Sequence, residues 1–306
     1  MPNYHLDFTS HKEVLFRNEQ DMNNWFNCFC SALYKTDSVC YVDCALSDHH
    51  HSCCRTKKPG ELIRICRDAY AKVFNNKYSR KGPLGEKGVY IVEIQGINHL
   101  LAELSYTLRN PVHHGVTGSP FEYKYSSANC YFRKELGKII DQPLLLSADQ
   151  IKKVLSPRAE FDSKWKMGVD GVFLRESVVD IAAVETTFGT AKAFNYYLGR
   201  KSSEEWAREQ AEDNGNEGVI TLESFERHFV NSAESVAKML RNENSRARLF
   251  RIGDLELCTL IDKEYAPRYG CNSVYQLTTA QKNLIANELY AKYKAGVSQI
   301  KRCLAL

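Results

Sequence analysis

The chain has 306 residues, of which 43% are hydrophobic and 25% are charged, and its formal net charge is +4. These proportions exclude disordered and fibrous proteins, and the length fits two domains that each bury a core. No segment reaches the ~18 uninterrupted apolar residues of a membrane helix, and residues 1–13 lack the apolar stretch of a signal peptide. We therefore expect a cytoplasmic protein.

The first half of the chain alternates β-prone segments with amphipathic ones. Strands are predicted at 13–17, 38–46 and 89–94, the second running on into 47–51, and helices at 21–34, 59–76 and 98–110, the last ended by Pro111. The order strand, helix, strand, strand, helix, strand is typical of a ferredoxin-like α+β domain, in which helices flank an antiparallel sheet. We expect this domain to span residues 1–144.

Beyond residue 145 the pattern changes to successive amphipathic segments with polar breaks. Helices are predicted at 147–155, 177–184, 190–198, 203–213, 222–230 and 233–241. Residues 145–306 are therefore expected to form a second, all-α domain.

The end of the chain, residues 278–304, contains two more predicted helices. Thr278 and Gln281 form a capping-box signature, and Gly296 separates the two helices. The pair resembles a helix-turn-helix, and a plain helical hairpin is the alternative. In a helix-turn-helix the second helix would present Gln299, Lys301 and Arg302.

The eleven cysteines are an odd number in a long chain without an export signal. Free thiols are therefore expected rather than a disulfide framework. Six of the cysteines lie close to histidines in the sequence, which leaves a structural zinc site as an alternative, although their spacings match no standard zinc motif. These are Cys28, Cys30, Cys40, Cys44, Cys53 and Cys54.

Basic residues outnumber acidic residues ten to three between residues 55 and 87. Such a stretch could follow a phosphate backbone, and a solvated helix face is the alternative.

Two histidines of the run 49–51 are expected to share one face of a strand. Side chains alternate between the faces of a strand, so His49 and His51 point one way and His50 the other. Two imidazoles on one face can bind a divalent metal and leave positions for substrate oxygens. An incidental pair of histidines is the alternative.

The helix predicted at 98–110 carries a polar stripe opposite its apolar one. The apolar stripe, expected to face the core, consists of Ile97, Leu100, Leu101 and Leu104. The opposite stripe, expected to be exposed, consists of His99, Glu103, Tyr106 and Asn110. An aromatic residue in a polar stripe suggests a function for Tyr106, although a surface tyrosine packed over its neighbours also fits.

The residues around Tyr106 form a longer motif. Residues 105–115 read Ser-Tyr-Thr-Leu-Arg-Asn-Pro-Val-His-His-Gly, and residues 120–127 read Pro-Phe-Glu-Tyr-Lys-Tyr-Ser-Ser. They closely resemble the Tyr-Ile-His-x-Asn-Pro-Val-x-x-Gly segment and downstream Ser-Ser of the REP-associated tyrosine transposases, which are HUH-type relatives of the single-tyrosine transposases of bacterial insertion sequences. Residues 48–51 resemble the family's metal motif of histidine, hydrophobic residue, histidine. The resemblance covers about residues 10–140.

The resemblance implies roles for four side chains. Tyr106 would be the nucleophile, and His49, His51 and Asn110 would hold the metal ion. His50 departs from the hydrophobic residue of the family motif, and residues 52–54 depart from its aliphatic continuation, but neither change removes a ligand. Tyr90, on the preceding strand, matches no catalytic position of the motif and is expected to be structural.

The implied chemistry explains these residue types. A tyrosine with a pKa of ~10 attacks a phosphodiester poorly unless its target is polarised. Two imidazoles and a neutral amide leave a divalent ion strongly electrophilic, and oxygen-rich substrates suit Mg or Mn. By analogy with the family, attack gives a 5′-phosphotyrosine and a free 3′-hydroxyl, and the bond energy kept in that link allows rejoining.

Single-stranded or hairpin DNA would need a basic groove and aromatic stacking. The residues expected to contact it are Arg55, Lys57, Lys58, Arg109, His113, His114, Lys124 and Arg133, with Tyr123 and Tyr125 for stacking. Glu103 is either a base, a fourth metal ligand or a solvated helix residue.

The expected function is thus a metal-dependent single-stranded DNA endonuclease and strand transferase, cytoplasmic and nucleoid-associated, that acts on hairpin or repeat elements. One alternative is a catalytically silent DNA-binding regulator derived from such an enzyme. Another is a Cys/His zinc protein. The sequence leaves open whether the chain acts as a monomer or a homodimer.

Overall fold

The computed structural model describes residues 1–10, 13–85, 89–138, 143–199, 252–293 and 295–306. Residues 3–94 form a four-stranded antiparallel sheet and two helices in the predicted order. They comprise β1 (Asn3–Thr9), α1 (Glu19–Lys35), β2 (Val39–Ala45), β3 (His49–Arg55), α2 (Pro59–Tyr78) and β4 (Tyr90–Ile94). The strand order β2-β3-β1-β4 fits a ferredoxin-like core.

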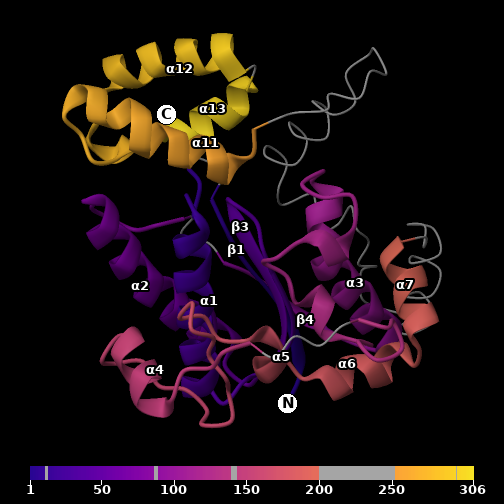
Figure 1. Ribbon diagram of the computed structural model, residues 1–306. Coiled ribbons are helices and arrows are strands. Elements are labelled where there is room, and N and C mark those ends of the chain that lie inside the picture. The colour runs from indigo at the N-terminus through magenta and orange to yellow at the C-terminus, as the bar shows by residue number, and fades with distance from the viewer. Residues whose placement is uncertain (11–12, 86–88, 139–142, 200–251, 294) are drawn as a thin grey trace, which may run out of the picture.

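Helices cover both faces of this sheet. In Figure 1, α1 and α2 lie on one side of the strands, and α3 (Ile97–His113) lies on the other. The face toward α1 carries a large aromatic core, in which Phe8 stacks on Trp25 with ring centroids 4.9 Å apart. The face toward α3 is more polar and holds the candidate site.

The first strand is not where the sequence analysis placed it. Residues 13–17 are irregular, and β1 is formed by Asn3–Thr9 instead. The apolar side chains of residues 13–17 are buried although the segment is not a strand. Leu15 and Phe16 join the core beside α1, whereas Val14 joins a second core in the C-terminal part. The backbone N–H groups of Leu15 and Phe16 both donate to the carbonyl oxygen of Ser47.

Two further boundaries differ from the prediction. The segment 38–51 is not one strand, because the chain turns at 46–48 and β2 and β3 pair as an antiparallel hairpin. Pro111 does not end α3 but lies inside it, and the helix continues to His113. A proline costs a helix one backbone hydrogen bond, but near a C-terminal end few bonds depend on it.

Two 3₁₀ turns and four short helices follow α3. They are η1 (Pro120–Glu122), η2 (Ser127–Cys130), α4 (Ala148–Val154), α5 (Arg175–Val178), α6 (Ile181–Phe188) and α7 (Ala191–Gly199). The helices predicted at 147–155 and 190–198 are confirmed. The one predicted at 177–184 is wrong, since the chain breaks there and Asp180 instead caps α6 by accepting from the N–H of Ala183.

Residues 145–199 pack against the sheet-containing part of the chain. Met167, Phe173 and Phe194 belong to the same buried cluster as the sheet residues. Arg175 on α5 reaches Asp43 on β2, with 3.1 Å between Nε and Oδ2. The domain division at 144/145 stays a prediction.

The C-terminal part is a compact group of helices with its own core. It comprises α11 (Asp254–Leu260), the helical turns η4 (Ile261–Tyr265), η5 (Ala266–Tyr269) and η6 (Val274–Gln276), then α12 (Thr279–Tyr293) and α13 (Val297–Leu304). The capping box is confirmed, because Thr278 and Gln281 exchange side-chain to backbone hydrogen bonds of 2.8 and 3.3 Å. The helices predicted at 203–213, 222–230 and 233–241 lie outside the described residues.

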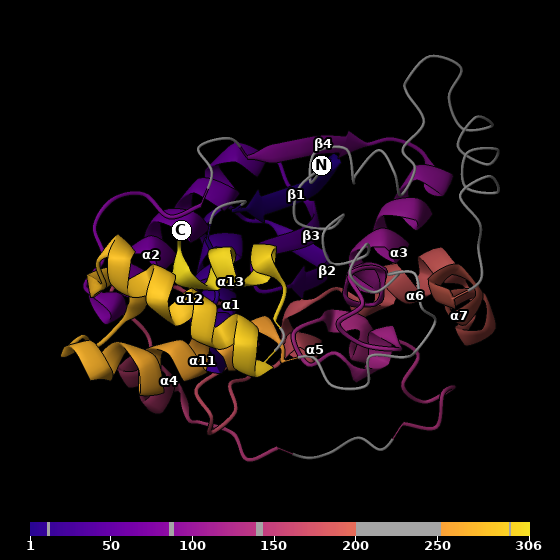
Figure 2. The same cartoon turned by 90° about the horizontal axis from the view of Figure 1, so that it is seen from above.

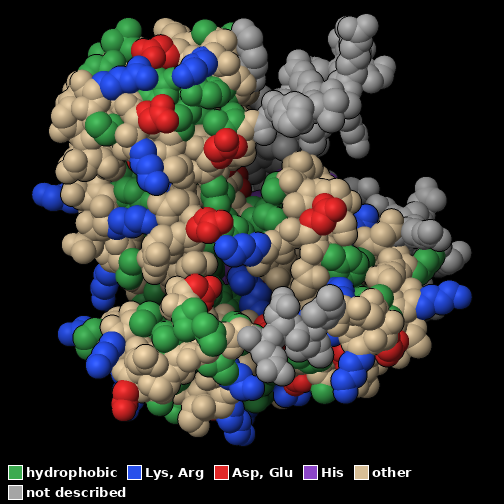
Figure 3. Space-filling model, in the orientation of Figure 1, with side chains coloured by type: hydrophobic (Ala, Val, Ile, Leu, Met, Phe, Trp, Pro, Cys, Tyr) green, Lys and Arg blue, Asp and Glu red, His purple; other side chains and the backbone are tan. Residues whose placement is uncertain are grey.

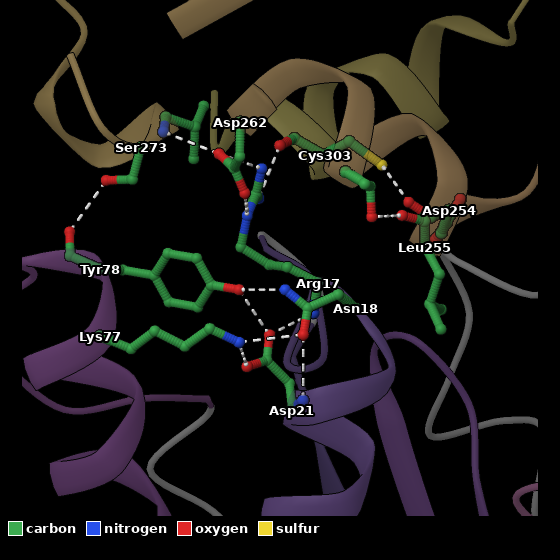
Figure 4. A network of polar contacts seen from close by, with 12 residues as sticks. Arg17, Asn18, Asp21, Lys77, Tyr78, Asp254, Leu255, Asp262, Ser273 and Cys303 are labelled. Atoms are coloured by element: carbon green, nitrogen blue, oxygen red, sulfur yellow. Dashed lines mark hydrogen bonds and ion pairs between the residues drawn. The ribbon is translucent and has the colours of Figure 1, made fainter. Parts of the chain in front are cut away.

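Polar contacts fasten this C-terminal group to the segment just before α1 and to the end of α2 (Figure 4). The Arg17 guanidinium is fully buried, donates to Asp262 at 2.7 and 3.1 Å, and donates to the carbonyl oxygen of Cys303 at 2.8 Å. Ser273 donates to the carbonyl oxygen of Tyr78 at 2.9 Å. Figure 2 shows α11, α12 and α13 lying over the end of α1. Across the described part of the chain, no helix is long and apolar enough to cross a membrane.

Candidate metal and nucleophile site

The sheet face toward α3 is lined by polar side chains from β1 and β3. In the antiparallel pairing Asp7 lies opposite His51, and Thr9 lies opposite His49. Because side chains alternate along each strand, the four residues share a face. His50 points the other way and packs against Trp25 and Phe29, with ring centroids 5.1 and 4.9 Å away. The predicted separation of His49 and His51 from His50 is confirmed.

Helix α3 lays its polar stripe on this face of the sheet. The Tyr106 ring lies 5.2 Å from the His51 ring, and Asn110 Oδ1 lies 2.8 Å from His49 Nε2. The expectation that the stripe is exposed is therefore wrong for its central residues, and Tyr106 is only 2% exposed.

The helix is buried on two sides, which the pattern of apolar residues did not reveal. Leu101, Leu104 and Leu108 pack into the large core, while Ile97, expected inside, is 52% exposed. A helix that lies between a sheet and further chain buries both stripes, so its polar stripe meets polar groups of the sheet instead of water.

His49 and Asn110 are positioned as two ligands of one ion would be. Metal–ligand bonds of ~2.1 Å at a right angle place two donor atoms ~3 Å apart, and the observed separation of Nε2 and Oδ1 is 2.8 Å. The His51 ring is 4.9 Å from the His49 ring. Among the described residues no group of three His, Cys, Asp or Glu side chains is arranged to hold a metal. A site here therefore depends on the Asn110 amide, and the described cysteines form no zinc cluster.

Each ring nitrogen of His49 faces an acceptor oxygen. Nδ1 lies 2.8 Å from Asp48 Oδ1, and Nε2 lies 2.8 Å from Asn110 Oδ1. Burial opposes protonation of His49, but Asp48 outweighs it, and the pKa of His49 is raised. The space between His49 Nε2 and Asn110 Oδ1 can thus be bridged in two ways, by a proton on Nε2 or by a divalent ion bound to both atoms.

A second histidine pair supports the other candidate ligand. His5 Nδ1 donates to Glu103 Oε1 at 2.7 Å, and Thr107 donates to the same oxygen at 2.9 Å. His5 Nε2 lies 3.4 Å from His51 Nδ1. Glu103 is fully buried, so the reading as a solvated helix residue is wrong. Its contacts fit a residue that holds His5.

Sequence reasoning missed His5 and Asp7, because it placed the first strand at 13–17. Asp7 Oδ1 lies 3.8 Å from His51 Nδ1, and burial, opposed by His49 and His5, raises the pKa of Asp7 to about 7. The alternation of polar and apolar residues along 5–8, His-Leu-Asp-Phe, was the signal that could have identified β1.

Most of the predicted DNA-contact residues are accessible. Lys57, Lys58, His113, Lys124 and Lys301 are exposed, and Arg55, Arg109 and Arg133 are half-buried. Lys124 pairs with Glu19 at 3.3 Å and Arg133 with Glu176 at 3.6 Å. On the face of the molecule drawn in Figure 3, Lys and Arg side chains are spread among Asp and Glu.

Three aromatic or imidazole groups are placed differently from the expectation. His114 is buried beside the candidate site, with its ring 4.9 Å from that of His49, so it does not offer a surface contact to DNA. Tyr123 and Tyr125 are also buried, and the Tyr123 hydroxyl donates to the carbonyl oxygen of Ala45 at 2.7 Å. The two rings contact each other, with centroids 5.7 Å apart, and neither is exposed at the surface.

Helix α13 was predicted to present three side chains to DNA, and two of them point toward the other C-terminal helices. Gln299 donates to Asp254 at 2.9 Å, and the buried Arg302 donates to the same carboxylate at 2.7 and 3.1 Å. Both side chains hold the C-terminal helices together in this structure, and DNA contact by Gln299 and Arg302 stays a prediction. Lys301 is exposed.

No protein-family model and no curated protein matches the chain. A solved structure that resembles it is that of a REP-associated tyrosine transposase bound to a REP hairpin. The match covers 44% of this chain and 79% of that chain, with 10% sequence identity and a TM-score of 0.37. It concerns the same family that residues 105–127 resemble. A likeness this weak assigns neither a function nor a site residue to this chain.

Proposed function

We propose that the chain is a metal-dependent single-stranded DNA endonuclease and strand transferase in which Tyr106 is the nucleophile. The observation that carries the proposal is the meeting of four side chains from two elements. His49 and His51 on β3 face Tyr106 and Asn110 on α3, and Asn110 contacts His49 at 2.8 Å. The two elements are far apart in sequence, so packing alone does not require these residue types to meet.

The chain's own groups would perform distinct parts of the reaction. His49, His51 and Asn110 would hold Mg or Mn. The ion would stabilise negative charge on the phosphate and on the leaving oxygen. Tyr106 Oη would attack phosphorus, the bond to the 3′ oxygen would break, and that oxygen would leave with a proton as a 3′-hydroxyl. The product is a 5′-phosphotyrosine, which a 3′-hydroxyl can attack in the reverse sense to rejoin the strand.

Helix α3 would set the geometry of attack. Tyr106 and Asn110 are one turn apart on it, so one rigid element fixes both the nucleophile and a ligand. Glu103, one turn earlier, is hydrogen-bonded to His5 and Thr107 through Oε1, which supports a role in positioning His5.

One observation favours a second candidate, a catalytically silent DNA-binding protein derived from such an enzyme. Tyr106, His49, His51 and Asn110 are all buried, and a phosphodiester must reach them for cleavage. Incubation with labelled single-stranded hairpin DNA and Mn separates the two functions. The enzyme forms a covalent adduct that survives denaturation, whereas the silent protein binds the DNA and forms none.

A further inference from the structure

The last helix of the chain reaches the residue next to a candidate metal ligand. Arg302 Nε, on α13, lies 3.5 Å from Oδ2 of Asp48. The other oxygen of the same carboxylate accepts from His49 Nδ1 at 2.8 Å. Both Asp48 and Arg302 are buried. One carboxylate therefore joins the C-terminal helices to His49.

Arg302 is itself held in one orientation. Its Nε and Nη2 donate to Oδ2 of Asp254 at 3.1 and 2.7 Å, and Ser47 donates to the same oxygen at 2.7 Å. Gln299 donates to the other oxygen of Asp254 at 2.9 Å. Ser47 directly precedes Asp48, so α11 and α13 fasten the turn between β2 and β3 at two adjacent residues.

The charges along this chain of contacts support one another. The buried Asp48 carboxylate has the Arg302 guanidinium 3.5 Å from one oxygen and the His49 ring nitrogen 2.8 Å from the other, so both of its oxygens are paired. The Asp48 carboxylate accepts a hydrogen bond from Nδ1–H of His49, and His49 Nε2 is then directed at Asn110. Carboxylates in this position fix the tautomer and ring orientation of metal-binding histidines.

We propose that Arg302 is a positioning residue of the candidate metal site, and that the site is complete only when the C-terminal helices are docked. Arg302 fixes the Asp48 carboxylate, and Asp48 fixes His49. The inference rests on the proposed function for the identity of the ligands. It adds that residues near the end of the chain control a site formed by β3 and α3, which makes the C-terminal helices part of the catalytic unit.

The test is the affinity of the full chain for Mn, measured by electron paramagnetic resonance without DNA. Losing an outer partner of a ligand typically lowers metal affinity ~10- to 100-fold. Arg302→Met and Asp48→Asn are each expected to show that loss, and the double variant is expected to be no weaker than Asp48→Asn alone. Arg302→Lys, which keeps the charge, should recover part of the affinity. Lys301→Met, its exposed neighbour, should bind Mn like the wild type.

A second readout does not depend on metal. In ¹⁵N NMR spectra of the metal-free protein, the His49 Nδ1 resonance should change in Arg302→Met and stay unchanged in Lys301→Met. If Arg302→Met does not fold, Asp254→Asn replaces it, because it loosens Arg302 and leaves the side chains of Asp48 and His49 unchanged.

Wild-type Mn affinity in a folded Arg302→Met or Asp254→Asn variant overturns the proposal, and so does a double variant whose losses simply add. Failure of the proposed function looks different. There the wild type binds Mn and responds to these substitutions but forms no covalent adduct with DNA.

Discussion

His49 Nε2 and Asn110 Oδ1 lie 2.8 Å apart although 61 residues separate them in the chain. The contact joins the start of β3 to the C-terminal part of α3 and brings an imidazole and an amide oxygen to one point. It is the feature of the structure on which the account of metal binding depends.

Replacing that amide should weaken metal binding without unfolding the protein. Asn110→Leu keeps the size of the side chain but removes the donor oxygen, so Mn affinity is expected to fall by at least ~10-fold, which is the lower bound for loss of even an outer partner. Isothermal titration calorimetry measures the change. Asn98→Leu, at the start of the same helix, is the control and should bind Mn normally. Equal affinities in the two variants would remove Asn110 from the ligand set.

The buried pair of Arg17 and Asp262 should contribute strongly to stability. Arg17→Met leaves Asp262 without its partner, and breaking a buried ion pair from one side costs about 3–5 kcal/mol. Denaturant unfolding monitored by circular dichroism is expected to show a loss of this order. The double variant Arg17→Met/Asp262→Leu should recover part of it, because no charge is then left unpaired. A single variant as stable as the wild type would contradict the docking shown in Figure 4.

Tyr123 should matter for stability and not for DNA binding. Its buried hydroxyl donates to Ala45, and removing a hydrogen bond of this kind costs about 1 kcal/mol. Tyr123→Phe is therefore expected to lower the free energy of unfolding by that amount, and Tyr123→Leu, which also removes the ring, is expected to leave the affinity for single-stranded DNA unchanged in a fluorescence anisotropy titration. A loss of affinity in a folded Tyr123→Leu variant would instead restore Tyr123 as a stacking residue.

The thiols should be free, and the buried Cys130 thiol should be slow to react. All eleven cysteines are free, and burial raises the pKa of the Cys130 thiol to about 12 from an ordinary value of 9.0. We expect eleven reactive thiols in the denatured, unreduced protein. In the native state at pH 8, alkylation of Cys130, followed by peptide mass spectrometry, should be slow, because the thiolate is the reactive form.

The raised pKa of Cys130 also makes the stability of the fold depend on pH. The folded state keeps the Cys130 proton more tightly than the unfolded state, so this contribution to stability is present below pH 9 and is lost as the pH rises toward 12. Cys130→Ser should flatten the fall in stability over that range. A slope identical to that of the wild type would mean that Cys130 does not titrate differently on folding.

The sequence predicted those parts of the site that depend on local periodicity. Alternation along 49–51 correctly separated His50 from its neighbours, and helical spacing correctly grouped Glu103, Tyr106 and Asn110. Which residues of α3 are buried depends on segments that cover the helix from elsewhere in the chain. Ile97, expected inside, is therefore exposed, and Tyr106, expected outside, is buried. Long-range contacts of this kind have no signature in a window of ten residues.

The remaining differences between prediction and structure have a similar cause. Residues 13–17 carry apolar side chains because two cores meet there, not because the segment pairs in a sheet, and this drew attention away from His5 and Asp7. Arg302 and Gln299 have the residue types of a DNA-reading helix, but their acceptor, Asp254, lies more than forty residues earlier. Charge and helical propensity identify such side chains and do not identify their partners.

The most direct test of the account is covalent capture of DNA by Tyr106. Wild type, Tyr106→Phe and Tyr90→Phe are incubated with 5′-labelled and internally labelled hairpin DNA in the presence of Mn and separated under denaturing conditions. Tyr90 is the matched control, because its ring lies 6.1 Å from that of His5, the same distance as that of Tyr106. We predict a metal-dependent adduct with wild type and Tyr90→Phe that is absent with Tyr106→Phe and retains the label on the 3′ side of the cut. An adduct of equal yield with Tyr106→Phe, or none with the wild type, would contradict the account.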